Sequence, residues 1–150
     1  MTIDFVLKKT PRLRVASIRW KGPYSEREIR RRFEEVEKWA RARGLRTGHW
    51  VFREPGTRVW DVAIEVRGNA RSEGRVKVRT LPGGTAASVR FDPDVVSPRV
   101  IYHGLSDWLR WRRKGKAIRS VVSYRELYEG NPWKNARAWA NTEVQFVVRR

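Results

Sequence analysis

VASIRW (residues 15–20) and AASVRF (residues 86–91) match position by position at an offset of 71 residues. Apolar residues occupy every second position of each stretch, while Arg19 and Arg90 fall at equivalent positions on the opposite face. This alternation is typical of a half-buried β-strand. The sequence therefore predicts the same strand twice, which indicates an internal duplication.

A helix is predicted after each of these strands. The first helix begins at a capping box of Ser25 and Glu28 and ends at Gly44. The second begins at 97–98, a Ser-Pro pair, and ends near Gly115. We expect the tryptophans of both helices to pack against the sheet. The two apolar stripes align at an offset of 72: Ile29 with Ile101, Phe33 with Leu105, Val36 with Trp108, and Trp39 with Trp111.

Two further strands should close each half of the chain. In the first half they are 48–54 and 59–68, joined by a Pro-Gly turn. In the second half they are about 117–124 and 142–149. Segment 68–74 is expected to be the loop that connects the halves.

The last strands of the two halves also align, now at an offset of 82 residues. Segment 61–67 matches 143–149, which makes Asp61 the counterpart of Glu143. The larger offset reflects an insertion at 127–141. Each half then has the order strand-helix-strand-strand.

We therefore predict an α+β fold, built as a pseudo-symmetric duplication of this unit. A largely antiparallel sheet should carry both helices on one face, within a single domain over residues 1–150. The repeat halves are expected at about 1–68 and 75–150.

Composition limits the classes of function. The chain has 150 residues and no cysteine, which excludes disulfides and thiolate metal sites. It has no phosphate-binding glycine motif and no histidine pair at metal spacing, so we expect neither a cofactor nor a metal. No apolar run is long enough to span a membrane, and the first residues do not resemble a secretory signal, so we expect a cytoplasmic protein.

The net charge of +18 is extreme. It is spread evenly: residues 1–75 hold 19 basic and 10 acidic residues, and residues 76–150 hold 15 and 6, which is +9 in each part. Two interpretations stay open. The charge either covers solvated, arginine-rich surfaces, or it binds nucleic acid non-specifically through 27–32 (REIRRR) and 110–116 (RWRRKGK).

Glu143 stands at the head of a predicted strand, directly after an aromatic insertion. The insertion contributes Tyr128, Trp133 and Trp139, and further aromatic residues occur in the first half. An acid in an aromatic cavity would select flat, lipophilic cations, and burial would raise its pKa unless cations or donors compensate. The alternative is a surface acid paired with one of the many arginines.

The chain resembles the GyrI-like domains. FVLKKTPRLRVASIRWKGPY (5–24) is similar to the opening of that family, with a Gly-Pro-Tyr turn before the first helix. ELYEGNP (126–132) followed by TEVQFVV (142–148) is similar to its closing signature. The likeness extends to the ligand-binding domains of MerR- and AraC-type multidrug regulators, here without a helix-turn-helix. One departure is DPDVVSPRV (92–100), where a second Gly-Pro-Tyr-like turn would be expected.

The resemblance implies a central cavity between the halves, with Glu143 as the pocket acid and Tyr128 near it. It also implies a small-molecule partner. Some stand-alone members of the family hydrolyse cyclopropane-bearing genotoxins with the pocket glutamate and a nearby aromatic residue or tyrosine.

Three functional hypotheses follow. The first is capture of lipophilic, cationic or aromatic compounds around Glu143. The second is hydrolysis, with Glu143 as general acid or base and Tyr128 orienting it. The third is non-specific nucleic-acid binding. The predicted ligand-binding residues are Glu143, Tyr128, Trp133, Trp139, Trp20, Tyr24, Trp50 and Asp61.

Overall fold

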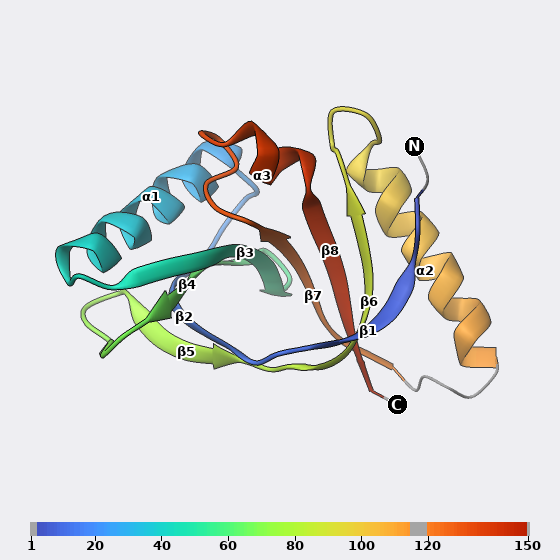
Figure 1. The fold of residues 1–150 in the computed structure, drawn as a ribbon, viewed down its shortest axis with the longest axis horizontal. Coiled ribbons are helices and arrows are strands. Elements are labelled where there is room, and N and C mark those ends of the chain that lie inside the picture. The colour runs from blue at the N-terminus through green and yellow to red at the C-terminus, as the bar shows by residue number, and fades with distance from the viewer. Residues whose placement is uncertain (1–2, 115–119, 150) are drawn as a thin grey trace. The chain divides into compact units, whose positions relative to one another are not determined.

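The computed structural model describes residues 3–114 and 120–149, which fold into two compact units (Figure 1). The first unit comprises residues 12–82, and the second comprises residues 1–11 together with 83–150. Each unit contains a four-stranded antiparallel sheet and one long helix. The predicted α+β class and the duplication are therefore confirmed.

The first unit has the strand order β3-β4-β2-β5. Its helix packs on the three strands β2, β3 and β4. The elements are β2 (Leu13–Lys21), α1 (Glu26–Ala42), β3 (Arg46–Gly56), β4 (Val59–Arg67) and β5 (Lys77–Leu81).

Helix α1 forms as its sequence predicts. The Ser25 hydroxyl accepts a hydrogen bond from the backbone amide of Glu28 at 3.2 Å and so caps the first turn. The chain leaves the helix through Gly44, whose φ of 67° lies in the left-handed region that glycine adopts without strain. The stripe at helical spacing is buried; its members are Ile29, Phe33, Val36 and Ala40.

The second unit repeats this plan with the strand order β1-β6-β8-β7. It also carries a short third helix just before β8. The elements are β1 (Val6–Thr10), β6 (Gly84–Phe91), α2 (Pro98–Lys114), β7 (Ser120–Tyr128), α3 (Ala136–Ala140) and β8 (Thr142–Arg149).

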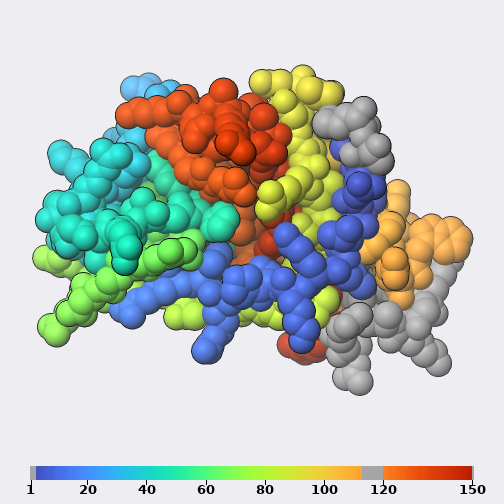
Figure 2. Space-filling view, in the orientation of Figure 1, coloured from blue at the N-terminus to red at the C-terminus, as the bar shows by residue number. Residues whose placement is uncertain are grey.

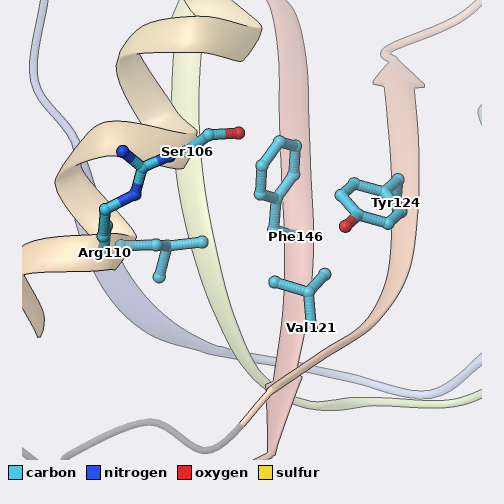
Figure 3. A pocket seen from close by; sticks show the side chains of 6 residues that line it. Ser106, Arg110, Val121, Tyr124 and Phe146 are labelled. Atoms are coloured by element: carbon cyan, nitrogen blue, oxygen red, sulfur yellow. The ribbon is translucent and has the colours of Figure 1, made fainter. Parts of the chain in front are cut away.

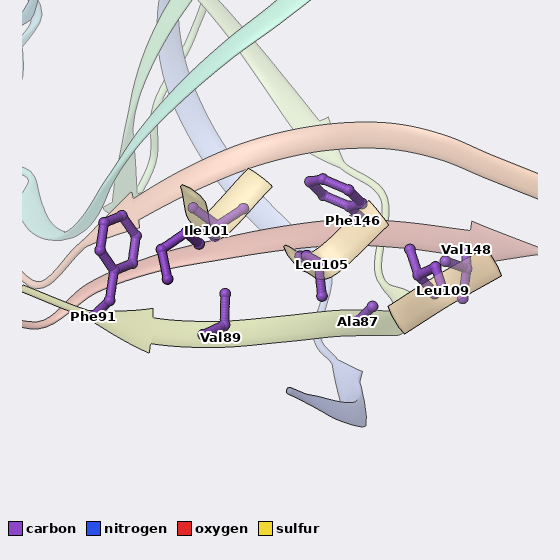
Figure 4. Close-up of a cluster of buried hydrophobic side chains, with 9 residues drawn as sticks. Ala87, Val89, Phe91, Ile101, Leu105, Leu109, Phe146 and Val148 are labelled. Carbon is purple, nitrogen blue, oxygen red and sulfur yellow. The ribbon is translucent and has the colours of Figure 1, made fainter. Parts of the chain in front are cut away.

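The core of the second unit lies between α2 and the sheet (Figure 4). Alternation along β6 and β8 turns one apolar set of side chains toward the helix. The buried cluster consists of Ala87, Val89, Phe91, Ile101, Leu105, Leu109, Val144, Phe146 and Val148. The alternate residues of β6 and β8 face away from α2, and most of them are polar, including Ser88, Arg90, Glu143 and Gln145.

The sequence did not reveal β1 and β5. Both are short edge strands with several charged residues, VLKKT and KVRTL, and such edges lack a clear apolar alternation. They nevertheless obey the repeat, because Val6–Thr10 shifted by 71 residues gives 77–81. The internal repeat therefore relates these two strands to each other, although hydrophobic alternation does not mark either of them.

The compact units also differ from the expected halves by these two strands. β1 precedes β2 in the chain but pairs with β6, whereas β5 precedes β6 but pairs with β2. The chain passes between units next to Pro11 and Pro82, which occupy equivalent positions of the repeat. Proline has no amide to donate to a strand ladder, so it suits a point where pairing changes partner.

The aromatic insertion differs from the predicted loop. β7 extends to Tyr128, so this residue ends a strand, and Trp139 lies within α3. Asn135 caps α3 by accepting from two backbone amides. The expected strand start at 117 and helix end at Gly115 lie outside the described residues. The expectation that the helix tryptophans pack against the sheet is wrong for Trp111, because 73 % of its surface is exposed.

Candidate ligand-binding site

The register of the second unit fixes the surroundings of Glu143. On β8, Glu143 stands opposite Arg90 of β6 and Leu127 of β7. Its neighbour Val144 points into the core under α2. Glu143 therefore points to the other face of the sheet, together with Gln145. Figure 2 shows β1 (blue) at the surface beside β6 (yellow), with β8 (red) visible only in part.

The carboxylate of Glu143 is nearly buried, with 6 % of the residue exposed. One oxygen, Oε2, accepts from the Ser88 hydroxyl at 2.7 Å and from the Gln145 amide at 2.5 Å. The Lys8 ammonium lies 2.8 Å from the same oxygen. The other oxygen, Oε1, accepts from Arg90 Nε at 3.2 Å. Both oxygens of the buried carboxylate are thus supplied with donors.

These donors decide the charge of Glu143. Burial alone would raise the pKa of the carboxyl, but the hydrogen bonds from Lys8, Ser88 and Gln145 and the charge of Lys8 outweigh it and lower the pKa to about 2. Glu143 is therefore ionised at neutral pH. The sequence had suggested either a buried acid in an aromatic cavity or an arginine-paired acid, and the site combines features of both: the acid is buried, and it has cationic partners.

A second layer of polar groups holds these donors in place. The buried Arg125 donates from Nε to Gln145 at 2.9 Å and from Nη2 to the Thr10 hydroxyl at 3.2 Å. Gln145 Oε1 is thereby occupied, which orients its amide nitrogen toward Glu143. The polar face is preorganised around one anion.

Six residues of this network were missing from the sequence-based site: Lys8, Thr10, Ser88, Arg90, Arg125 and Gln145. Gln145 and Ser88 could have been found, because each lies two positions from a residue that was considered and so shares its face. Lys8 could not, because it reaches Glu143 only through the pairing of β1 with β6.

Tyr128 lies elsewhere than expected. Its hydroxyl donates to Glu126 at 2.7 Å, and so does the hydroxyl of Tyr102 from α2. Glu126 faces the helix side of the sheet, so the Tyr128 hydroxyl also points to that side, away from Glu143. The predicted role of Tyr128 in orienting Glu143 does not fit this geometry.

The two insertion tryptophans are half-buried. Trp139 stacks on the ring of Tyr128, with centroids 6.4 Å apart and planes 1° from parallel, and its indole nitrogen donates to Asp94. The structure thus brings Trp139 and Tyr128 of the insertion together. That Trp133 and Trp139 bind a ligand stays a prediction.

The first unit holds the other predicted residues. Trp20 is half-buried, with the Arg32 guanidinium 5.6 Å from its ring. Tyr24 is 64 % exposed and meets Trp60 edge-on at 5.5 Å. Both rings therefore offer accessible aromatic surface.

Trp50 and Asp61 are less accessible. Trp50 is 1 % exposed and stacks on Phe33 of α1 at 5.0 Å, so a ligand would have to displace Phe33 to reach it. Asp61 is fully buried and accepts a hydrogen bond from Arg53 Nε at 3.0 Å. Neither residue presents accessible surface to a ligand.

The basic segment 27–32 is partly paired with carboxylates of its own helix. Arg30 pairs with Glu34 at 3.0 Å, while Glu28 pairs with Arg31 at 2.9 Å and Arg32 at 3.5 Å. The second segment, 110–116, lies partly outside the described residues, which break off at 114 and resume at 120. Nucleic-acid binding stays a prediction, with less free charge on α1 than the sequence suggested.

Within residues 3–114 and 120–149, no cluster of three acidic or histidine side chains could hold a metal ion. The helices of this part of the chain are also too short or too polar to cross a membrane.

Comparison with known proteins identifies the fold. The C-terminal domain of EcmrR is 21 % identical over 100 % of this chain and 99 % of that domain, with a TM-score of 0.77. In the cryo-EM structure of the EcmrR–DNA complex, this chain spans 58 % of the EcmrR chain, again at 21 % identity with a TM-score of 0.77 and covering 99 % of this chain. No curated protein sequence matches the chain.

More distant structures share the fold as well. SAV2435, solved with bound tetraphenylphosphonium, is 12 % identical with a TM-score of 0.55 and covers 97 % of this chain and 94 % of its own. A hydrolase encoded by lin2189 from Listeria innocua is 11 % identical with a TM-score of 0.61 and covers 97 % and 91 %. The family model for the GyrI-like small molecule binding domain matches residues 3–149. The chain therefore belongs to the GyrI-like small-molecule-binding domain family.

Proposed function

We propose that this protein captures a lipophilic cation at Glu143, and that the positive charge of the ligand takes the place of the Lys8 ammonium. One observation carries the proposal: an ionised, nearly buried carboxylate has its cationic partners on side chains that reach solvent. The side chain of Lys8 is 39 % exposed and that of Arg90 is 54 % exposed, whereas that of Glu143 is 8 % exposed.

The exchange of one cation for another avoids the largest electrostatic cost. An unpaired buried carboxylate would be expensive, but Ser88 and Gln145 remain bonded to Glu143 while the cation changes. Glu143 thus keeps at least two donors throughout.

The exchange also favours lipophilic cations over small hydrated ones. The Lys8 ammonium is strongly hydrated, so its return to water recovers hydration energy. A cation with aromatic arms loses little hydration and gains roughly 25 cal/mol for each Å² of apolar surface that it buries. Trp133 and Trp139 of the insertion, which belong to the same unit as Glu143, supply rings for cation–π and stacking contacts in this proposal.

The tetraphenylphosphonium complex of SAV2435 supports the class of ligand, although at 12 % identity that likeness extends only to the fold. Hydrolysis has less support. A general acid must hold a proton near the working pH, and the pKa of about 2 leaves Glu143 without one. Tyr128, its expected partner, donates to Glu126 instead.

The test is a titration of tetraphenylphosphonium followed by intrinsic tryptophan fluorescence. We expect saturable binding by the wild type, and Glu143→Gln should weaken it by about 1–3 kcal/mol, the scale of a lost charged interaction in a shielded site. The neutral triphenylphosphine oxide should bind both proteins weakly and equally.

Glu126→Gln is the matched control, because Glu126 lies on the opposite face of the same sheet. It removes the same charge from the neighbouring strand and should leave the affinity unchanged. Equal affinity of wild type and Glu143→Gln for the phosphonium, or an equal loss in Glu126→Gln, would disprove a site at Glu143.

A further inference from the structure

A small cavity opens on the opposite face of the second unit, between α2 and the strands β7 and β8 (Figure 3). Its volume is about 160 Å³. Six side chains line it: Ser106, Leu109 and Arg110 from α2, Val121 and Tyr124 from β7, and Phe146 from β8. Because Phe146 and Glu143 point to opposite faces of β8, this cavity is separate from the Glu143 site.

The floor and the rim of the cavity differ in chemistry. Leu109 and Phe146 form part of the floor; both belong to the buried core cluster and are 3 % and 1 % exposed. Tyr124 stands at the rim, half exposed, and meets the ring of Phe146 nearly at right angles with centroids 4.7 Å apart. The cavity thus offers a fixed apolar floor with an aromatic wall.

Arg110 gives the rim a positive charge. It is exposed, and within the described part of the chain no carboxylate lies in ion-pair contact with it. This contrasts with Arg30 and Arg31 of α1, which pair with glutamates one turn away. Hydroxyl groups of Ser106 and Tyr124 add hydrogen-bonding capacity beside the guanidinium.

We propose that this cavity binds a small aromatic carboxylate. A cavity of roughly 150 Å³ holds one benzene ring, so the volume fits a single ring with a short anionic group. The ring would lie on Phe146 and Leu109 against Tyr124, and the carboxylate would receive two parallel hydrogen bonds from Arg110. The two faces of this sheet would then recognise ligands of opposite charge.

Benzoate is the probe, and its binding is measured by calorimetry and by chemical-shift mapping on the ¹⁵N-labelled protein. For so small a ligand we expect a dissociation constant on the order of 1 mM, with shifts centred on Ser106 and Val121. Benzyl alcohol, which lacks the charge, and acetate, which lacks the ring, should each bind at least about tenfold more weakly.

Arg110→Gln should weaken benzoate binding at least about tenfold. Arg112→Gln is the matched control, because it removes the same charge from the same helix while Arg112 lies over the Trp108 ring, 4.7 Å from its centroid. It should change the affinity less than twofold. Ser106→Trp, at an exposed position, fills the mouth of the cavity and should abolish the shifts without unfolding the protein.

Three results would overturn the proposal: equal losses in Arg110→Gln and Arg112→Gln, acetate binding as well as benzoate, or no benzoate shifts at the cavity. Glu143→Gln should bind benzoate as the wild type does. The benzoate titration of Glu143→Gln therefore tests this cavity independently of the cation site, because either binding proposal can be disproved while the other holds.

Discussion

Two buried acids occupy equivalent positions of the duplicated sheet and are held in different ways. Asp61 on β4 stands opposite Arg19 of β2, and Glu143 on β8 stands opposite Arg90 of β6. The strand positions and the flanking arginines therefore correspond. The nearest cation, however, comes from a different strand in each unit.

In the first unit the cation comes from the adjacent strand. Arg53 of β3 stands opposite Asp61, bonds it through the guanidinium, and has a side chain only 12 % exposed. In the second unit that register position holds Leu127. Glu143 instead receives Lys8 from the exchanged strand β1, through a side chain that is 39 % exposed.

The exposure of the cationic partner distinguishes the two acids: Asp61 has a buried partner that holds it in place, and Glu143 has an exposed partner that can be exchanged. A guanidinium locked in the core cannot leave Asp61 without exposing a buried charge. A lysine at the surface can swing into water while Ser88 and Gln145 keep their bonds to Glu143. Duplication supplied two similar acids, and under the proposed function the leucine at the position of Arg53 is what leaves Glu143 accessible to a ligand.

The largest expected effect is on the locked pair. Arg53→Met leaves the Asp61 carboxylate buried without its main partner and should lower the free energy of unfolding by about 3–5 kcal/mol in urea denaturation. Arg19→Met is the matched control and should cost less than about 1 kcal/mol, because Arg19 lies 3.7 Å away on a side chain that is 36 % exposed. Similar small losses in both variants would show that Arg53 does not lock Asp61.

The next effect concerns acid stability. The pKa of Glu143 is lowered from 4.5 to about 2, so its contribution to folding is complete above pH 4.5 and is lost as the pH falls toward 2. The shift corresponds to about 3 kcal/mol. Unfolding free energies measured across this range should show the loss in wild type and in Glu126→Gln, and Glu143→Gln should lack it. An unchanged pH profile in Glu143→Gln would refute the lowered pKa.

The sequence was a good guide to the fold because the fold is repeated. Three predictions came from positions that are equivalent in the two units. They are the match of 15–20 with 86–91, the two helices with their N-terminal capping residues, and the alignment of Asp61 with Glu143. The secondary structure was not predicted where a segment lacked hydrophobic alternation or a counterpart in the other unit. The helix α3 within the insertion has no counterpart in the first unit, and it was assigned to a loop.

The site was harder to predict because its contacts join distant parts of the chain. Lys8 and Glu143 are far apart in sequence and meet because β1 pairs with β6 rather than in its own half. Tyr128 illustrates the opposite failure. Tyr128 lies on the strand next to Glu143, one residue after Leu127, which stands opposite Glu143. Alternation nevertheless turns the Tyr128 hydroxyl to the other face of the sheet, where it donates to Glu126.

A smaller effect tests the substitution that distinguishes the units. Leu127→Arg places a guanidinium opposite Glu143, as Arg53 stands opposite Asp61. Phosphonium affinity should fall about tenfold, or about 1.4 kcal/mol, because the added cation competes at close range. Leu127→Met keeps the volume and should bind as the wild type does. Unchanged phosphonium affinity in Leu127→Arg would mean that the register position does not control access to Glu143.

The smallest effect should come from removing the competing lysine. In the proposed exchange the ligand must displace the Lys8 ammonium from Glu143, so Lys8→Met should raise phosphonium affinity, by up to about tenfold. Lys9→Met is the matched control, because Lys9 follows on the same strand, points to the opposite face and has no ion pair with a described residue. Fluorescence titration of both variants measures the difference. Weaker binding by Lys8→Met would show that the lysine assists the ligand rather than competing with it, and the exchange would then be wrong even if Glu143 remains the binding residue.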